Sequence, residues 1–265
     1  ILYEVKKGNT FLDRLDITKI EGMVTGTIYT NMLGGDTAKD GWVYIDGERY
    51  KTADAEIQNY AGATVCAYYK AVKGEEDKII YFTGQDKKFN EIILKGSEIT
   101  EVSGTSDLTV RYIPGGRKQE GLKEEKIKIS SVAREFFNGV YNGGAELEKH
   151  INEISQDLNG SIRLFDNDGD EIFDAVHLEQ YSSYSVRYVD TTARRIHVKG
   201  AGINYIDLDE DKVDNLVVMR RGGVKTLSDI KADDIIQYSV SKDGKTVKIV
   251  ATGLSSTSEL NNDLK

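Results

Sequence analysis

The residues with the clearest chemical potential lie in one acidic stretch, residues 166–174. Aspartates stand at its first, third, fifth and ninth positions: Asp166, Asp168, Asp170 and Asp174. Four carboxylates so close together repel one another, and a bound hard cation would remove that repulsion. Calcium takes about six to eight oxygen ligands from carboxylates, main-chain carbonyls and water. We therefore predict a calcium site made by these four side chains and the main-chain carbonyl of Ile172.

The other residues of this stretch favour a hard cation over a soft one. The stretch holds no Cys or His, the ligands of softer metals, and Gly169 lets the main chain turn tightly between ligands. The helix-loop-helix calcium pattern does not fit, because Glu171 and His177 stand at positions 6 and 12, where that pattern has Gly and Glu. The alternative is an acidic, solvated hairpin turn without a metal. Neither interpretation makes the stretch catalytic.

A second acidic run, residues 207–214, has carboxylates at its first, third, fifth and eighth positions but no Gly. The residues on either side of it are similar to those around the first stretch. A second metal site is one interpretation of this run. A solvated turn is the interpretation that we favour.

The composition indicates a β-rich, acidic protein. The 265 residues include 26 Gly, 15 Tyr and one Pro, and 39% of them are hydrophobic. Many Gly together with Tyr, Val, Ile and Thr favour numerous short strands joined by tight turns. We therefore predict an all-β fold with one or two short helices, arranged as two to three small barrel-like or sandwich-like domains. The net charge of −9 opposes binding to nucleic acid or to an anionic membrane, since both require a basic surface.

Local signals place some of these elements. Asp46-Gly47 and Asp243-Gly244 each separate two runs of strand-forming residues, which is the strongest short-range signal for a β-hairpin. A helix is predicted within residues 144–158, because apolar residues recur there at i, i+4 and i+7: Leu147, Ile151 and Ile154. The single Cys66 lies in a strand-like run, where we expect a small buried hydrophobe.

These signals divide the chain into five parts. They are an N-terminal strand and connector (1–18), a small β-barrel (19–100), a β domain with the helix and the acidic hairpin (101–202), a small SH3-like barrel (203–253) and a linker or tail (254–265). Residues 50–84 and 224–253 share an order of strands and turns, which is consistent with a degenerate duplication. There is no initiator Met, signal peptide or apolar run near 18 residues, so we expect a piece of a longer protein.

Patterns typical of enzymes are missing from the sequence. No Gly-rich phosphate loop precedes a helix, no Ser lies in a Gly-x-Ser-x-Gly elbow, and the three His have no zinc spacing. We therefore predict that the protein is not an enzyme. A carboxylate pair for glycoside hydrolysis stays open, because 44 acidic residues make some pairing inevitable.

Two known families share motifs with this chain. The acidic stretch resembles the calcium hairpin of FG-GAP (integrin β-propeller) repeats, with Glu171 where that family has a second Gly. Residues 137–143, 160–170 and 173–190 together resemble the β-rich ectodomain segments of Firmicutes surface proteins that carry S-layer homology (SLH) domains, in which a Tyr-Asn-Gly strand, an acidic loop and an aromatic strand recur in this order. The SLH repeats themselves are absent from this sequence.

The resemblance implies an exported, non-catalytic structural module at the cell surface or cell wall, stabilised by calcium. The partners that it implies are other cell-surface protein subunits or cell-wall polysaccharide, with no nucleic acid and no membrane insertion. Two other functions remain open. One is a carbohydrate- or protein-binding module, such as an adhesin or a virion or tail component, and the other is a glycan-acting hydrolase.

Overall fold

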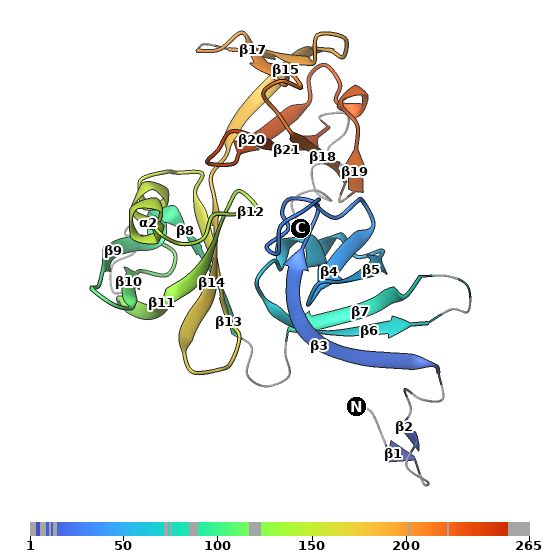
Figure 1. Ribbon diagram of the computed structural model, residues 1–265. Helices are drawn as coiled ribbons and strands as arrows, with labels where there is room; N and C mark the ends of the chain where they lie inside the picture. Colours follow the sequence, from blue (N-terminus) through green and yellow to red (C-terminus); the bar gives the residue numbers. More distant parts are fainter. Residues whose placement is uncertain are drawn as a thin grey trace.

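A computed structural model of the chain describes residues 4–5, 9–10, 12, 15–71, 74, 76–84, 90–116, 123–200, 202–221 and 223–253. These residues form three β units, which touch one another in pairs (Figure 1). One α-helix lies among them, so the prediction of an all-β fold with a short helix is confirmed. Two short strands, β1 (Glu4–Val5) and β2 (Asn9–Thr10), pair with each other before the first unit.

The first unit, residues 17–84, is a closed barrel with the strand order β3-β4-β5-β7-β6. Its strands are β3 (Ile17–Gly26), β4 (Trp42–Ile45), β5 (Glu48–Thr52), β6 (Thr64–Lys70) and β7 (Lys78–Gly84), with a 3₁₀ turn, η1, at Ala55–Asn59. The barrel closes because β3 pairs with β6 along most of its length and with β4 at its end. Asp46 and Gly47 have φ of 49° and 83°, which confirms the tight hairpin predicted between β4 and β5.

The second unit, the middle sheet, spans residues 90–179 and has the order β8-β13-β14-β11-β10-β9, with β12 paired to β11. Its elements are β8 (Asn90–Lys95), η2 (Gly96–Glu98), β9 (Ile99–Ser103), β10 (Leu108–Tyr112), β11 (Glu125–Phe137), β12 (Val140–Tyr141), α2 (Leu147–Ser155), β13 (Ser161–Asp166) and β14 (Ile172–Glu179). The helix lies where it was predicted. Its apolar residues Leu147, Ile151 and Ile154 are buried in the core of this unit.

The third unit, the C-terminal sheet, spans residues 182–252 and has the order β17-β16-β15-β20-β21-β18-β19. Its elements are β15 (Ser182–Asp190), β16 (Arg195–Lys199), β17 (Tyr205–Asp207), β18 (Asn215–Arg220), β19 (Gly223–Lys225), η3 (Leu227–Asp229), β20 (Ile235–Val240) and β21 (Thr246–Thr252). The order β5-η1-β6-β7 recurs as β19-η3-β20-β21, and each series ends in an antiparallel pair. This agrees with the predicted duplication in element order. The described strands of the C-terminal sheet form an open sheet, where we predicted a barrel.

The sheets divide the chain at different points from the predicted domains. The barrel begins at Ile17 rather than at 19, and β8 pairs with β13 of the middle sheet, so residues 90–100 do not belong to the barrel. Strands β15 and β16 pair with the C-terminal sheet, which therefore begins near 182 rather than 203. The physical reason is that strand-forming residues specify a strand but not its partner. The predicted tail, residues 254–265, lies outside the described residues.

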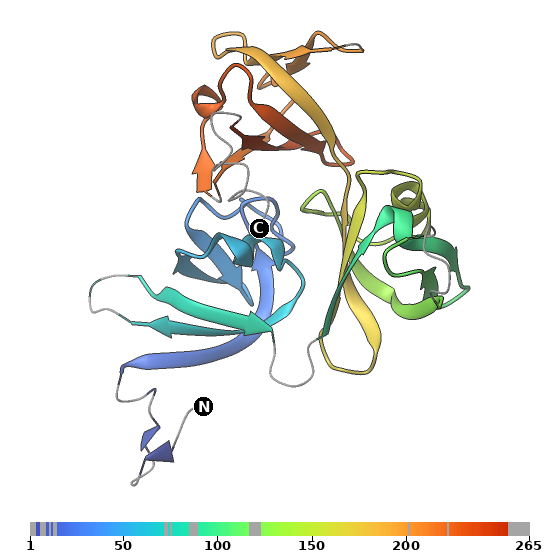
Figure 2. The same ribbon diagram turned by 180° about the vertical axis from the view of Figure 1, so that it is seen from behind.

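Each pair of units is joined by an asparagine side chain. In Figure 2, as in Figure 1, the C-terminal sheet lies above both other units, and the barrel lies beside the middle sheet. Each asparagine donates its side-chain amide to a main-chain carbonyl of the neighbouring unit: Asn138 to Val240 at 2.7 Å, Asn167 to Gly62 at 3.0 Å and Asn215 to Ile28 at 3.0 Å. Lys248 of the C-terminal sheet also bonds Glu179 of the middle sheet and lies over the ring of Tyr29 in the barrel.

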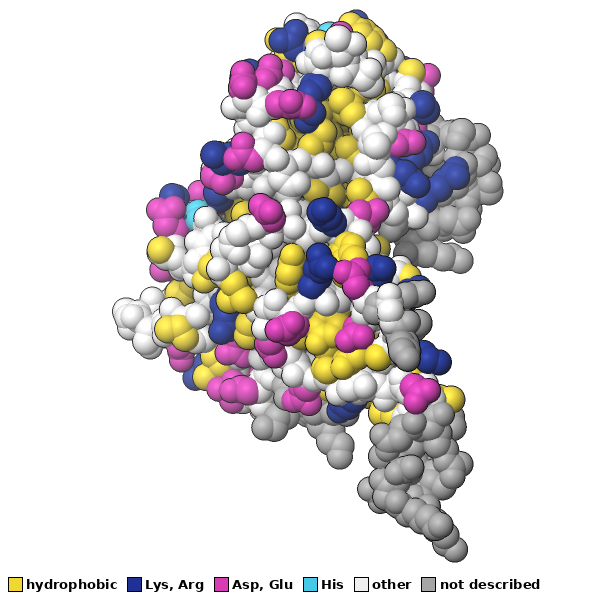
Figure 3. Space-filling model, turned by 45° about the vertical axis from the view of Figure 1, so that its right-hand side comes forward, with side chains coloured by type: hydrophobic (Ala, Val, Ile, Leu, Met, Phe, Trp, Pro, Cys, Tyr) yellow, Lys and Arg dark blue, Asp and Glu magenta, His cyan; other side chains and the backbone are white. Residues whose placement is uncertain are grey.

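The surface carries both signs of charge. On the face shown in Figure 3, acidic and basic side chains are interspersed over most of the described residues, with hydrophobic side chains exposed between them. In the part of the chain that the structure describes, no helix is long and apolar enough to cross a membrane.

Candidate metal centre

The acidic stretch forms the turn of the β13–β14 hairpin. Leu164 pairs with Val176, Phe165 pairs with Ala175, and all four side chains are buried. Leu164 and Val176 pack in the core of the middle sheet, and Phe165 and Ala175 pack against the barrel on the other face. A slip of one residue would exchange these two differently shaped sets, so their burial fixes the register of the two strands. The same register places Asp166, the last residue of β13, close to Asp174 near the start of β14.

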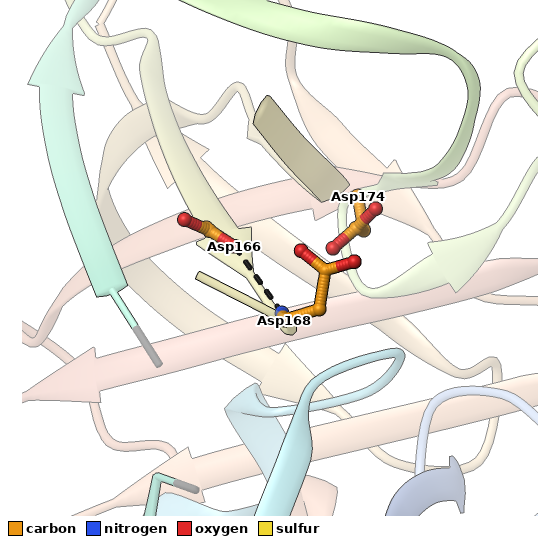
Figure 4. Close-up of side chains that lie close together, drawn as sticks. All are labelled: Asp166, Asp168 and Asp174. Carbon is orange, nitrogen blue, oxygen red and sulfur yellow. Dashed lines mark hydrogen bonds between the residues drawn. The ribbon is translucent and has the colours of Figure 1, made fainter. Parts of the chain in front are cut away.

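Three of the four predicted aspartates come together at this end of the hairpin. Carboxylate oxygens of Asp166, Asp168 and Asp174 lie within 4.8 Å of one another. In Figure 4 the carboxylates of Asp168 and Asp174 face each other, and the main-chain nitrogen of Asp168 donates to Asp166. Asp166 is buried, Asp174 half-buried and Asp168 exposed, so the cluster reaches from the core to the surface.

Backbone N–H groups hold the carboxylates in place. The buried Asp166 accepts three of them: from Asp168 (3.2 Å) and Gly169 (2.7 Å) on Oδ1, and from Glu171 (3.1 Å) on Oδ2. Asp174 Oδ2 accepts the N–H of Asn167 at 2.9 Å. The loop is therefore wrapped around Asp166, and its carboxylates are positioned before any ligand arrives.

Two residues of the loop adopt left-handed backbone conformations. Gly169 has φ of 79° and Glu171 has φ of 67°. Glycine adopts this region without steric cost, whereas a residue with a Cβ does not. Glu171 stands where the FG-GAP pattern has its second Gly, so the departure in sequence falls on a position where glycine would be unstrained.

The charge in this cluster is not balanced by any cation within it. Burial raises the pKa of Asp174, and the N–H of Asn167 opposes that rise, while the neighbouring carboxylates of Asp168, Asp166 and Asp170 add to it. Lone pairs stay free, because the hydrogen bonds to Asp168 and Asp174 use one oxygen of each. Hard oxygen donors with spare lone pairs fit a calcium ion. Asp166, Asp168 and Asp174 are the residues that would hold it.

The other two predicted ligands are placed differently. Asp170 is outside the three-carboxylate group, and its Oδ1 accepts the N–H of Ile172 at 2.8 Å. Ile172 begins β14 and pairs with Lys128 of β11. The participation of Asp170 and of the Ile172 carbonyl stays a prediction.

Sequence reasoning missed the role of Asn167, which connects the loop to the barrel. Its side chain accepts the N–H of Thr64 at 2.7 Å and donates to the carbonyl of Gly62 at 3.0 Å. Its own N–H meanwhile bonds Asp174. One feature of the sequence could have indicated this role. Asn167 lies between two aspartates, at a position where the calcium-loop pattern would also accept an aspartate.

A buried contact continues this connection between barrel and middle sheet. Ala61 and Ala63 of the barrel pack against Phe136, Phe165 and Ala175 of the middle sheet. His177, next in the sheet, contacts the Ala61 carbonyl through Nε2 at 2.6 Å, and burial lowers its pKa to about 4. At neutral pH the imidazole is therefore uncharged, and its Nε2–H donates to that carbonyl.

Basic side chains pair with part of the second acidic run. Asp207 bonds Lys212 at 2.6 Å, and Asp214 bonds Lys245 at 3.0 Å. No group of three metal-ligating side chains forms here among the described residues. These ion pairs support the solvated-turn interpretation. Elsewhere, the prediction that Cys66 is buried is confirmed.

Comparison with known proteins adds little to this geometry. No protein-family model matches the chain, and no curated protein matches it. One similar solved structure is the crystal structure of a multidomain protein with nucleic acid binding domains from Streptococcus pneumoniae TIGR4. It aligns with 90% of this chain and 74% of its own length, at 12% identity and a TM-score of 0.17. A TM-score this low supports no conclusion about fold or function.

Proposed function

We propose that this chain is a non-catalytic structural and interaction module of an exported bacterial cell-envelope protein. In this proposal, calcium held by Asp166, Asp168 and Asp174 fixes the barrel against the middle sheet. The partners are other cell-surface protein subunits or cell-wall polysaccharide. Support comes from the oxygen-only ligand cluster and from the resemblance to S-layer-type surface proteins described above.

One observation carries the structural part of this proposal: the loop that gathers the carboxylates also holds the barrel. Asn167 bonds Asp174 through its main chain and residues 62 and 64 through its side chain. An ion bound between Asp168 and Asp174 would restrict the main chain on both sides of Asn167. Ordering the loop in this way would lower the entropic cost of keeping the Asn167 side chain on the barrel.

The expected energy is modest but measurable. A ligand that binds the folded state alone stabilises it by RT ln(1 + [L]/Kd), which is about 1.4 kcal/mol at ten times the Kd. Extracellular calcium modules bind at about 10⁻⁴–10⁻³ M. A few millimolar calcium should therefore raise the melting temperature by a few degrees, and a chelator should reverse the effect.

Amide hydrogen exchange of Thr64 tests the connection directly, because its N–H bonds Asn167 across the junction. Calcium should slow that exchange. The amide of Asp46, which bonds Met23 within the barrel at 2.8 Å, should exchange at the same rate with and without calcium. If calcium raises the melting temperature but leaves Thr64 exchange unchanged, the ion binds without fixing the junction.

Three variants separate the roles of the aspartates. Asp168→Ala removes an exposed carboxylate of the cluster and should abolish the calcium effect on melting. Asp211→Ala removes an exposed aspartate of the second acidic run and should preserve it. Asp170→Ala asks whether a fourth carboxylate takes part. A calcium response that is equal in wild type and Asp168→Ala would refute the assigned site.

A further inference from the structure

A cleft of about 390 Å³ lies where the middle sheet meets the C-terminal sheet. Its walls come from the end of β11, the turn after α2, the link from β14 to β15, and the end of β20. Ligand sites in proteins concentrate at such junctions between units and commonly have volumes of about 300–1,000 Å³. The cleft is separate from the aspartate loop, which contributes no residue to it.

Hydrogen bonds between lining residues hold one side of this cleft in place. Asn138, buried at the base, donates to the Val240 carbonyl at 2.7 Å and accepts the N–H of Gln180 at 2.8 Å. Asp157 accepts the side-chain amide of Gln180 at 2.6 Å and the N–H of Asn159 at 2.8 Å. The site is therefore formed before a ligand binds, which reduces the entropic cost of binding.

The lining of the cleft, in contrast, offers polar groups that have no protein partner. Among the described residues, no hydrogen bond engages the hydroxyls of Tyr181, Ser182, Tyr238 and Ser239 or the side-chain oxygen of Gln180. Hydroxyls both donate and accept, and the amide oxygen accepts. The Tyr181 ring adds apolar surface beside these groups, whereas the Tyr238 ring packs against Tyr184 and the core of the C-terminal sheet. This combination matches a ligand that carries hydroxyls on an apolar ring.

The charges of the cleft exclude other classes of ligand. Lys242 bonds Glu153 at 2.6 Å and lies over the ring of Phe137, so it is already engaged. Asp157 accepts hydrogen bonds from two uncharged donors, the Gln180 side-chain amide and the Asn159 N–H, and keeps its negative charge, so a phosphate or another anion would find no free counter-charge here among the described residues. An added peptide strand is excluded because β20 already has β15 on one side and β21 on the other.

We propose that this cleft binds one residue of a neutral saccharide, with the ring of Tyr181 against its C–H face and the unpartnered hydroxyls and the Gln180 oxygen on its hydroxyl groups. This site rests on the proposed function, because it gives the place where a polysaccharide partner would bind, and it does not depend on the calcium site.

Amide NMR spectra of the full chain, titrated with neutral trisaccharides, test the proposal. N-acetylglucosamine trimer, cellotriose and mannotriose serve as probes. At least one should shift the amides of residues 180–182 and 238–241 and leave the barrel unaffected. The titration should give the same shifts with calcium and with a chelator, so its outcome is independent of the outcome at the aspartate loop.

Variants identify the binding groups. Tyr181→Ala should weaken binding roughly tenfold, as for a contact residue at the centre of a site, and Tyr238→Phe, which keeps the ring, should weaken it about threefold. Tyr188→Ala removes an exposed tyrosine of β15 outside the cleft and should leave binding unchanged. The proposal is overturned if none of the trisaccharides shifts the cleft amides, or if Tyr181→Ala and wild type titrate alike.

Discussion

Replacement of Glu171 by glycine tests whether the aspartate loop carries backbone strain. Glu171 is exposed and has φ of 67°, and its N–H bonds Asp166, which glycine would preserve. A residue with a Cβ in this region costs about 1–2 kcal/mol. Glycine would remove that cost. It would also raise the conformational entropy of the unfolded chain, which destabilises the folded state by about 0.4–1 kcal/mol. The net expectation for Glu171→Gly is a stabilisation of about 0.5–1 kcal/mol.

The removal of a negative charge must be separated from the relief of strain. Glu171→Gln is the matched control, because it removes the charge from the acidic turn and keeps the Cβ. Urea denaturation in the presence of a chelator gives the free energy of unfolding of both variants. The free energy of unfolding of Glu171→Gly should exceed that of Glu171→Gln by about 0.5–1 kcal/mol, and its melting temperature should be about 1–4 °C higher. Equal stability, or a less stable glycine variant, would show that residue 171 is unstrained.

Three further predictions concern the same junction. Burial raises the pKa of Asp174, so the folded protein favours the protonated carboxyl. The stability that this protonation contributes is present below the unfolded pKa of about 4 and is lost as the pH rises through the pKa of the folded state. Asp174→Asn should therefore stabilise the protein at pH 7 in a chelator and destabilise it relative to wild type in calcium, as thermal melting in both conditions will show. His177 has a pKa lowered to about 4, so the free energy of unfolding should fall by up to roughly 3 kcal/mol as the pH drops from about 6.5 to 4. Urea titrations at each pH should show a smaller loss for His177→Gln. Asn167→Ala should cost about 1–3 kcal/mol by leaving the Thr64 N–H and the Gly62 carbonyl unpaired, and should remove the effect of calcium on Thr64 exchange. An Asn167→Ala variant as stable as wild type would contradict the role given to this side chain.

Local features of this fold could be predicted because neighbouring residues determine them. Asp46-Gly47 adopts the positive φ angles that its hairpin requires, and the spacing of Leu147, Ile151 and Ile154 gives the buried face of α2. The clustering of Asp166, Asp168 and Asp174 followed from their spacing across one turn. In each case the information lies within about a dozen residues.

Features that depend on distant partners could not be predicted in the same way. Strand β8 has the same strand-forming composition as its barrel neighbours, yet it pairs with β13, some seventy residues later in the chain. Asn167 was indistinguishable from a further loop residue, because its partners Gly62 and Thr64 lie more than a hundred residues earlier. Asp170 fitted the spacing rule, but its carboxylate accepts the Ile172 N–H outside the cluster.

The three asparagine bonds between units have a mechanical consequence. Three bodies connected in a row can swing about each connector, whereas three bodies connected in a closed triangle cannot rotate at one corner without opening another. Here Asn138, Asn167 and Asn215 occupy the three corners. A tensile force on the chain would therefore meet all three units as one body until a corner breaks.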